Sequence, residues 1–189
     1  VFTPHAIFPP TSRVNQFLQH IYDRFLGKPL LCQSDIVIAL NRKNMMELEQ
    51  LGTPTKKIIV IPNSIDYEEF IHIPAEELFR EKYGVTKEYI LFNGRIVEHK
   101  GVHILLEAIK KVENELNLEL VIIGKGEGNY LKRILKFIQD NGLENKVLIL
   151  DTLEREMQLS AYNGAKMFIL PSFQEGLPTV LLEAMAMGK

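Results

Sequence analysis

Residues 118–128 read LELVIIGKGEG, and this stretch decides the fold. Its first six residues form a continuous run rich in apolar and β-favouring side chains, and glycines follow at once. A run without alternation is typical of a parallel strand buried on both faces. The glycines have the spacing G-x-G-x-G. The dinucleotide fingerprint G-x-G-x-x-G would need its third glycine at position 129, where this chain has Asn129. We therefore interpret the glycines as a tight turn from a strand into a helix.

The same pattern recurs along the chain. Five further short apolar runs predict strands at Ile36–Leu40, Ile58–Ile61, Tyr89–Phe92, Val147–Leu150 and Met167–Leu170. Between them, apolar residues repeat at helical spacing over 104–112 and 131–138. Strands that alternate with amphipathic helices predict an α/β fold with doubly wound, Rossmann-like parallel sheets.

Turn chemistry interrupts this pattern between Pro62 and Ala75. We expect residues 1–70 to be the end of one α/β domain with its hinge, and residues 71–189 to be a second domain that begins afresh. The chain starts at Val1 in what resembles the tail of a strand, and it stops at a glycine that follows a predicted helix. We expect an internal piece of a longer protein, truncated at both ends.

Composition and charge indicate which classes of binding partner and site the chain does not favour. The chain has 22 Lys+Arg against 24 Asp+Glu, which gives no electrostatic case for nucleic acid. Cys32 is the only cysteine, so neither an intrachain disulfide nor a cysteine-based zinc site can form, and a reducing, cytoplasmic location is favoured. No apolar run reaches membrane-spanning length.

We expect the ligand-binding residues directly after the predicted strands, because ligands of open parallel sheets bind outside the carboxyl ends of the strands. Gly94, Arg95 and Lys100 follow the strand predicted at Tyr89–Phe92. Gly94 allows close backbone approach, and the two cations suit a diphosphate. The alternative for this pair alone is a solvated loop. Asp151 and Thr152 follow another strand and suit a contact to a base or a ribose.

The last predicted strand leads into SFQEGLPTVLLEAMA, residues 172–186. This stretch has Glu175 on a loop and Glu183 one turn inside a helix that we expect to begin near Thr179. Two carboxylate acceptors beside free N–H groups at a helix start suit a hydroxyl-rich ligand that carries phosphate, such as a nucleotide sugar. Two charged groups of complementary type thus converge on one sheet edge.

These motifs resemble the donor domain of the retaining family 4 glycosyltransferases, which have the two-domain GT-B fold. The resemblance rests on Gly94-Arg95, Lys100-Gly101, residues 122–126, Pro171-Ser172 and Glu175-x7-Glu183, and on a hinge-like PNSID at 62–66. It runs almost continuously from Tyr89 to Lys189. Departures from the family pattern are Ser64 in place of the hinge glycine, Asp151 in place of a glycine, and Lys166 in place of an aspartate.

The resemblance implies a role for each matching residue. Arg95 and Lys100 would hold the donor diphosphate, Glu183 would accept hydrogen bonds from the ribose, and Glu175 would face the sugar ring near its anomeric carbon. His5 would reach the sugar from the acceptor domain. The segment that would offer its backbone to the donor consists of Gly176, Leu177, Pro178 and Thr179.

The implied activity is transfer of a hexosyl group from a nucleotide diphosphosugar to a saccharide or lipid acceptor, with retention of configuration and without a metal or cofactor. We expect this piece alone to be inactive. The alternatives are an epimerase or hydrolase of nucleotide sugars on the same fold, a nucleotide-binding fragment without activity, and a nicotinamide oxidoreductase, which the imperfect glycine spacing disfavours.

Two further segments have competing interpretations. Tyr162 occupies an aromatic position of the family, and we expect it to pack within its helix rather than to stack on a base. Residues 15–31 have six apolar residues on one helical side and basic residues nearby. We expect this side to face a core, and the alternative is peripheral contact with a membrane.

Overall fold

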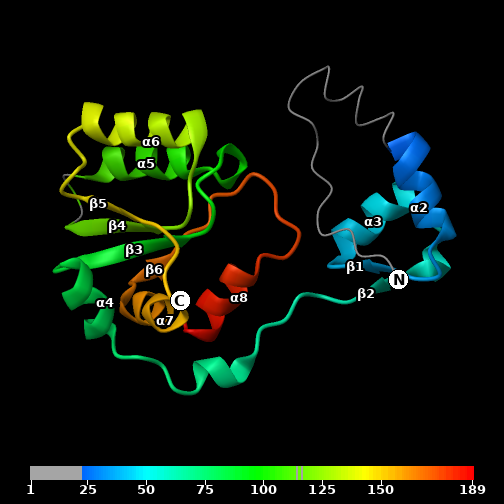
Figure 1. Ribbon diagram of the computed structural model, residues 1–189, viewed down its shortest axis with the longest axis horizontal. Helices are drawn as coiled ribbons and strands as arrows, with labels where there is room; N and C mark the ends of the chain where they lie inside the picture. The colour runs from blue at the N-terminus through cyan, green and yellow to red at the C-terminus, as the bar shows by residue number, and fades with distance from the viewer. Residues whose placement is uncertain (1–22, 114, 116) are drawn as a thin grey trace. The chain divides into compact units, whose positions relative to one another are not determined.

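The computed structural model describes residues 23–113, 115 and 117–189, and it divides into two compact units (Figure 1). Residues 23–64 together with Gln174–Pro178 form the N-terminal unit. The other described residues, from Ile65 to Phe173 and from Thr179 to Lys189, form the C-terminal unit. His5, one of the predicted site residues, lies outside the described part of the chain.

The N-terminal unit is a short β-α-β arrangement. Its elements are η1 (Asp23–Gly27), α2 (Lys28–Gln33), β1 (Val37–Ala39), α3 (Arg42–Gln50), η2 (Thr55–Lys57) and β2 (Ile58–Val60). β1 and β2 pair in parallel, with Val37 opposite Ile58. Helix α3 begins where it does because the Asn41 side chain accepts a hydrogen bond from the N–H of Asn44 at 2.8 Å. Leu31 and Leu48 pack with the strand β1 in a small core.

The expectation that the strand at Ile58–Ile61 is buried on both faces is wrong. β2 is not buried on both faces, since Ile59 and Val60, which point to opposite sides, are 45% and 40% exposed. The physical reason is that β2 has only β1 as a paired neighbour among the described strands. Of the segment 15–31, residues 15–22 lie outside the described part of the chain. In its described part, Phe25 and Leu26 of η1 are 68% and 55% exposed, so these two do not face a core. Leu31, at the end of the same predicted segment, does.

The C-terminal unit is built on a four-stranded parallel sheet. Its strands are β3 (Glu88–Asn93), β4 (Leu118–Ile123), β5 (Val147–Leu150) and β6 (Met167–Phe168), in the order β5-β4-β3-β6. Ile90, in the middle of β3, lies opposite Leu120 on one side and Met167 on the other. All four predicted strands of this sheet are confirmed, although β6 ends at Phe168, two residues earlier than expected.

Helices cover both faces of this sheet (Figure 1). The helical elements of the unit are η3 (Tyr67–Phe70), α4 (Glu76–Tyr83), η4 (Glu98–Lys100), α5 (Val102–Val112), α6 (Gly128–Asp140), α7 (Arg155–Gly164) and α8 (Thr179–Ala186). α5 and α6 lie on one face, and α4, α7 and α8 lie on the other. Successive residues of β3 therefore enter different cores: Tyr89 and Leu91 pack toward the α7 side, and Ile90 and Phe92 pack toward the α5 side.

The strand order reverses once. From β3 the chain moves outward to β4 and β5, and it then returns through α7 to the opposite side of β3, where β6 lies. In open α/β sheets, ligands bind in the crevice outside the carboxyl ends of the strands at such a switch point. We therefore expect the functional site in the segments that follow β3 and β6.

Candidate functional site

The loop after β3 and the segment after β6 are packed tightly together. The N–H of Phe173 donates to the carbonyl of His99 at 2.9 Å. Gly101 has a φ of 70°, and a Cβ placed there would lie 2.2 Å from the carbonyl oxygen of Pro171. Only glycine satisfies both the backbone conformation and this close approach. The two segments at the switch point thus form one structural corner.

A second close approach joins the loops after β3 and β4. A Cβ at Gly124 would lie 2.0 Å from the carbonyl oxygen of Gly94, whose own N–H donates to the carbonyl of Ile123 at 2.9 Å. A Cβ at Gly126 would lie 2.9 Å from the Cβ of Ile96. Gly124 and Gly126 thus allow the predicted tight turn after β4 to pack against a neighbouring loop.

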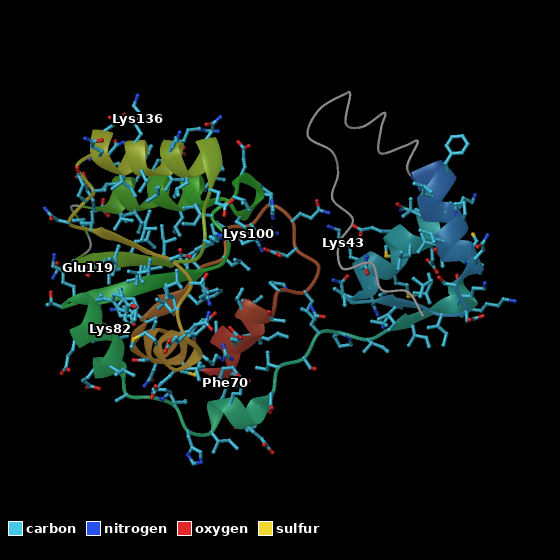
Figure 2. The ribbon with its side chains drawn as sticks, viewed as in Figure 1. Lys43, Phe70, Lys82, Lys100, Glu119 and Lys136 are labelled. Carbon is cyan, nitrogen blue, oxygen red and sulfur yellow. The ribbon has the colours of Figure 1, made fainter. Side chains whose placement is uncertain are left out.

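The predicted phosphate-binding cations lie in this corner. Arg95 is exposed, and Lys100 is half-buried at the end of η4, directly before α5. Figure 2 shows Lys100 at the end of the sheet where the loops gather, while Glu119, near the amino end of β4, lies at the opposite end. Gly94, Arg95 and Lys100 therefore share one loop at the carboxyl edge.

Glu183 lies in α8, and two side chains of α7 contact its carboxylate. Arg155 Nη1 donates to Glu183 Oε1 at 2.9 Å. The Tyr162 hydroxyl lies 3.2 Å from both Glu183 Oε2 and the carbonyl oxygen of Val180, and it accepts a hydrogen bond from Asn93 Nδ2 at 3.0 Å. Asn93 is the last residue of β3. Glu183 is thereby connected to the carboxyl end of the strand that leads into the phosphate-binding loop.

Tyr162 packs within the fold, as expected. Its ring is fully buried and lies 5.6 Å from that of Phe168, centroid to centroid. Burial raises the pKa of the Tyr162 hydroxyl well above its ordinary value, although the hydrogen bond from Asn93 opposes this. The hydroxyl therefore stays protonated and remains a hydrogen-bond donor beside Glu183.

Arg155 is the residue that the sequence analysis missed. Besides its bond to Glu183, its Nε donates to Glu69 Oε2 at 2.8 Å, and its guanidinium lies 5.4 Å from the centroid of the Phe70 ring. Desolvation acts to lower its pKa, but the carboxylates of Glu69 and Glu183 outweigh this effect and the pKa is raised. No local pattern identifies it, because its partners Glu69 and Glu183 are distant in the sequence.

Asp151 and Thr152 lie after β5, at the edge of the sheet farthest from β6. Both are exposed, and Asp151 Oδ1 accepts a hydrogen bond from the N–H of Thr152 at 2.6 Å. They share the carboxyl end of the sheet with the phosphate-binding loop, two strands away from the switch point.

Arg95 and Lys100 belong to the C-terminal unit, whereas Glu175 lies in residues 174–178, which belong to the N-terminal unit. Within that unit, Asn41 Nδ2 donates to the carbonyl of Gly176 at 2.7 Å, and Asn63 Nδ2 donates to the carbonyl of Leu177 at 2.7 Å. The side chains of two asparagines thus hold the backbone of this segment. Pro178 has no N–H to offer a ligand, whereas Thr179 begins α8 as predicted.

The described residues contain neither a metal-binding cluster nor a membrane-spanning helix. No group of three or more His, Cys, Asp or Glu side chains in the described part of the chain is arranged to hold a metal ion. No helix within residues 23–113, 115 and 117–189 is both long enough and apolar enough to cross a membrane.

The parallel sheets covered by helices define a Rossmann-like α/β protein with the architecture of the GT-B glycosyltransferases. The chain belongs to the family described as glycosyl transferases group 1, whose model matches residues 75–189. Among solved structures, sucrose-phosphate synthase from Thermosynechococcus elongatus matches 99% of this chain and 48% of its own, with a TM-score of 0.81 and 20% identity.

Two further proteins extend the comparison. HepE from Anabaena in complex with UDP-glucose matches 99% of this chain and 50% of its own, with a TM-score of 0.79 and 23% identity. An uncharacterized glycosyltransferase of Methanocaldococcus jannaschii is 35% identical over 143 residues, which cover 72% of this chain and 36% of the relative. The chain thus spans half or less of the length of these proteins.

Proposed function

We propose that the protein containing this chain is a retaining family 4 glycosyltransferase, which moves a hexosyl group from a nucleotide diphosphosugar to a saccharide or lipid acceptor. The observation that carries the proposal is the corner at the switch point, where the Lys100 loop packs against the segment after β6. Glu183 is linked through Tyr162 and Asn93 to the end of β3, from which that loop starts. Family membership and the UDP-glucose bound by HepE support it.

The chemistry of the proposed reaction is stabilisation of a leaving group. As the bond from the anomeric carbon to the diphosphate oxygen breaks, negative charge grows on the diphosphate. Arg95 and Lys100 are two cations on one loop beside it, and the free N–H groups at the start of α8 add a partial positive charge. In this proposal the protein's own cations neutralise the diphosphate, and no metal takes part.

The remaining roles follow the same proposal. Glu183 accepts hydrogen bonds from the ribose hydroxyls, and the carboxylate of Glu175 orients the sugar ring. The Glu175 segment, held by Asn41 and Asn63, presents its backbone to the sugar. The acceptor binds largely through residues outside this chain.

Ligand-induced stabilisation of the full-length protein tests the proposal. UDP-, GDP- and ADP-glucose are each added in a thermal-unfolding experiment, and one of them is expected to raise the melting temperature. A ligand at 100 times its dissociation constant adds about 2.7 kcal/mol to the free energy of unfolding. NAD serves as the control, because a hydride-transfer enzyme would respond to it and a glycosyltransferase would not.

Product analysis completes the test. With a saccharide acceptor, NMR is expected to show a new glycosidic bond with the anomeric configuration of the donor. Stabilisation by NAD alone, or a product with the opposite configuration, would contradict the proposal.

A further inference from the structure

We propose that Arg155 is a positioning residue, whose guanidinium holds the Glu183 carboxylate in one orientation for the ribose diol of the donor nucleotide. This inference rests on the proposed function, because it assigns Glu183 to the ribose. It adds a residue outside the motifs that indicated the family, since Arg155 lies between the strand β5 and the motif that contains Glu183.

The contacts of Arg155 leave its guanidinium little freedom. Nε and Nη2 lie 2.8 and 2.7 Å from Glu69 Oε2, and Nη1 lies 2.9 Å from Glu183 Oε1 and 2.8 Å from Gln158 Oε1. The Phe70 ring packs against it, and Figure 2 shows Phe70 beneath α8. A planar guanidinium with donors in a fixed fork can bridge two carboxylates in this way, whereas an ammonium group has no such geometry.

The carboxylate of Glu183 needs this partner because it is largely enclosed. Its side chain is 14% exposed, against 37% for Arg155. A carboxylate at that depth is costly to bury unless a cation and hydrogen-bond donors contact it. Arg155 provides both for Oε1, and the Tyr162 hydroxyl beside Oε2 limits the rotation of the carboxylate.

Acceptor positions remain on the carboxylate for a ligand. An ionised carboxylate accepts about four hydrogen bonds in all, and Arg155 and Tyr162 each contact a different oxygen. Each oxygen therefore keeps one acceptor position, and its residual exposure gives a ligand access. Two acceptors spaced as the oxygens of one carboxylate suit the two hydroxyls of a vicinal diol.

Arg155 also links this site to the segment that follows the hinge-like PNSID. Glu69 belongs to η3, which starts at Tyr67, and the Asp66 side chain caps this short helix by accepting from the N–H of Glu68 at 3.0 Å. A purely local ion pair on α7 would not need a partner from so distant a part of the sequence. The guanidinium thus connects η3, α7 and α8 at one point.

The experiment measures how strongly the full-length protein discriminates ribose from deoxyribose. Calorimetry gives dissociation constants for UDP, GDP and ADP and for their 2′-deoxy forms, with the wild type, Arg155→Met and Arg155→Lys. Hydrogen bonds to a charged group are worth about 1.5–3 kcal/mol, so the wild type is expected to prefer the best ribonucleotide by roughly 10- to 100-fold. Arg155→Met is expected to reduce this preference to less than about threefold.

Arg155→Lys keeps the charge but cannot bridge both carboxylates, so it is expected to reduce the preference by at least about threefold. Arg80→Met is the matched control. Arg80 also pairs with a glutamate, Glu76, and lies over a tyrosine ring, but it contacts the carbonyls of Lys87 and Gly164 at the amino ends of the strands. Its removal is expected to lower the melting temperature and to leave the ribose preference unchanged.

The outcomes separate this inference from the proposed function. If Arg155→Met weakens the ribo and deoxy ligands equally, Arg155 has only a structural role and the inference is overturned. An unchanged preference in Arg155→Lys overturns it even where the methionine variant does not fold. A wild type that binds nucleotides without any ribose preference also overturns it, whereas a wild type that binds no nucleotide refutes the proposed function itself.

Discussion

Lys100 and Glu183 lie at the same end of one sheet, and their surroundings suit opposite tasks. Lys100 is half-buried in a loop that leads through Gly101 into α5, so it lies near the amino end of that helix. An anion there meets both a side-chain cation and a helix dipole. Glu183 is enclosed between Arg155 and Tyr162, which restrict the orientation of its carboxylate. In the proposed reaction, Lys100 stabilises the negative charge that develops on the diphosphate, and Glu183 orients the uncharged hydroxyls of the ribose.

Replacement of Lys100 tests the first of these roles. Lys100→Ala is expected to lower kcat for sugar transfer by roughly 10²- to 10³-fold, because it removes a preorganised cation from the departing diphosphate. Steady-state kinetics at saturating donor measures the effect. Lys136→Ala removes the same charge from the exposed side of α6 and is the control (Figure 2). Unchanged turnover in Lys100→Ala would show that the lysine has no part in the reaction.

At the residue scale, sequence reasoning succeeded where a residue sits in a local motif. The Lys100 loop and the start of α8 could be located because short-range patterns determine where a strand ends and a helix begins. Arg155 could not be assigned, because its partners Glu69 and Glu183 lie 86 and 28 residues away and meet it only after folding.

At the scale of elements, glycines decide how closely the loops at the carboxyl edge can approach. Gly101 and Gly84 have nearly the same backbone conformation, with φ of 70° and 69°. A Cβ at Gly84 would meet nothing within 4 Å, whereas a Cβ at Gly101 would lie 2.2 Å from the backbone of Pro171. Gly84 therefore serves only to end a helix, and Gly101 also allows two elements to pack.

This difference predicts unequal costs for the same substitution. Gly84→Ala is expected to lower the free energy of unfolding by about 1–2 kcal/mol, from backbone strain alone. Gly101→Ala is expected to lower it by roughly a further 1–3 kcal/mol, because the methyl group must displace a backbone segment. Urea denaturation of both variants measures the costs. Equal losses would mean that the close approach of Gly101 to Pro171 does not affect the free energy of unfolding.

At the scale of the whole molecule, the C-terminal unit has one core on each face of its sheet, and two tyrosines are wholly buried beside the same core. The Tyr89 hydroxyl donates to the carbonyl of Ala161 at 2.7 Å, and Tyr162 faces Glu183. Burial raises the pKa of both hydroxyls. Neither residue can ionise in the folded state at a pH where an unfolded tyrosine already does.

Alkaline solution is therefore expected to destabilise the fold. The folded-state pKa of each tyrosine is raised, so its contribution to stability is complete below the unfolded pKa of about 10 and is lost as the pH rises above that value. Each residue is expected to contribute a loss of about 1.4 kcal/mol per pH unit there. Urea denaturation between pH 8 and pH 11 measures this slope.

Tyr89→Phe is expected to make the alkaline slope shallower, although the variant is less stable at neutral pH because the bond to Ala161 is lost. Tyr67→Phe, at an exposed ring, is the control and is expected to leave the slope as it is. A slope identical in all three proteins would show that ionisation of Tyr89 is not linked to unfolding.

Local pattern was sufficient to predict the strands, the main helices, the parallel α/β class and the loops that carry Arg95 and Lys100. Apolar periodicity and glycine position act over a few residues, so they can be recognised in an unfolded chain. Folding was needed to establish the order β5-β4-β3-β6, the open faces of β2, the grouping of Glu175 with the N-terminal unit, and the contact between Arg155 and Glu183. These features depend on which distant segments bury one another's surfaces, and burial is a property of the assembled molecule rather than of any single stretch of the chain.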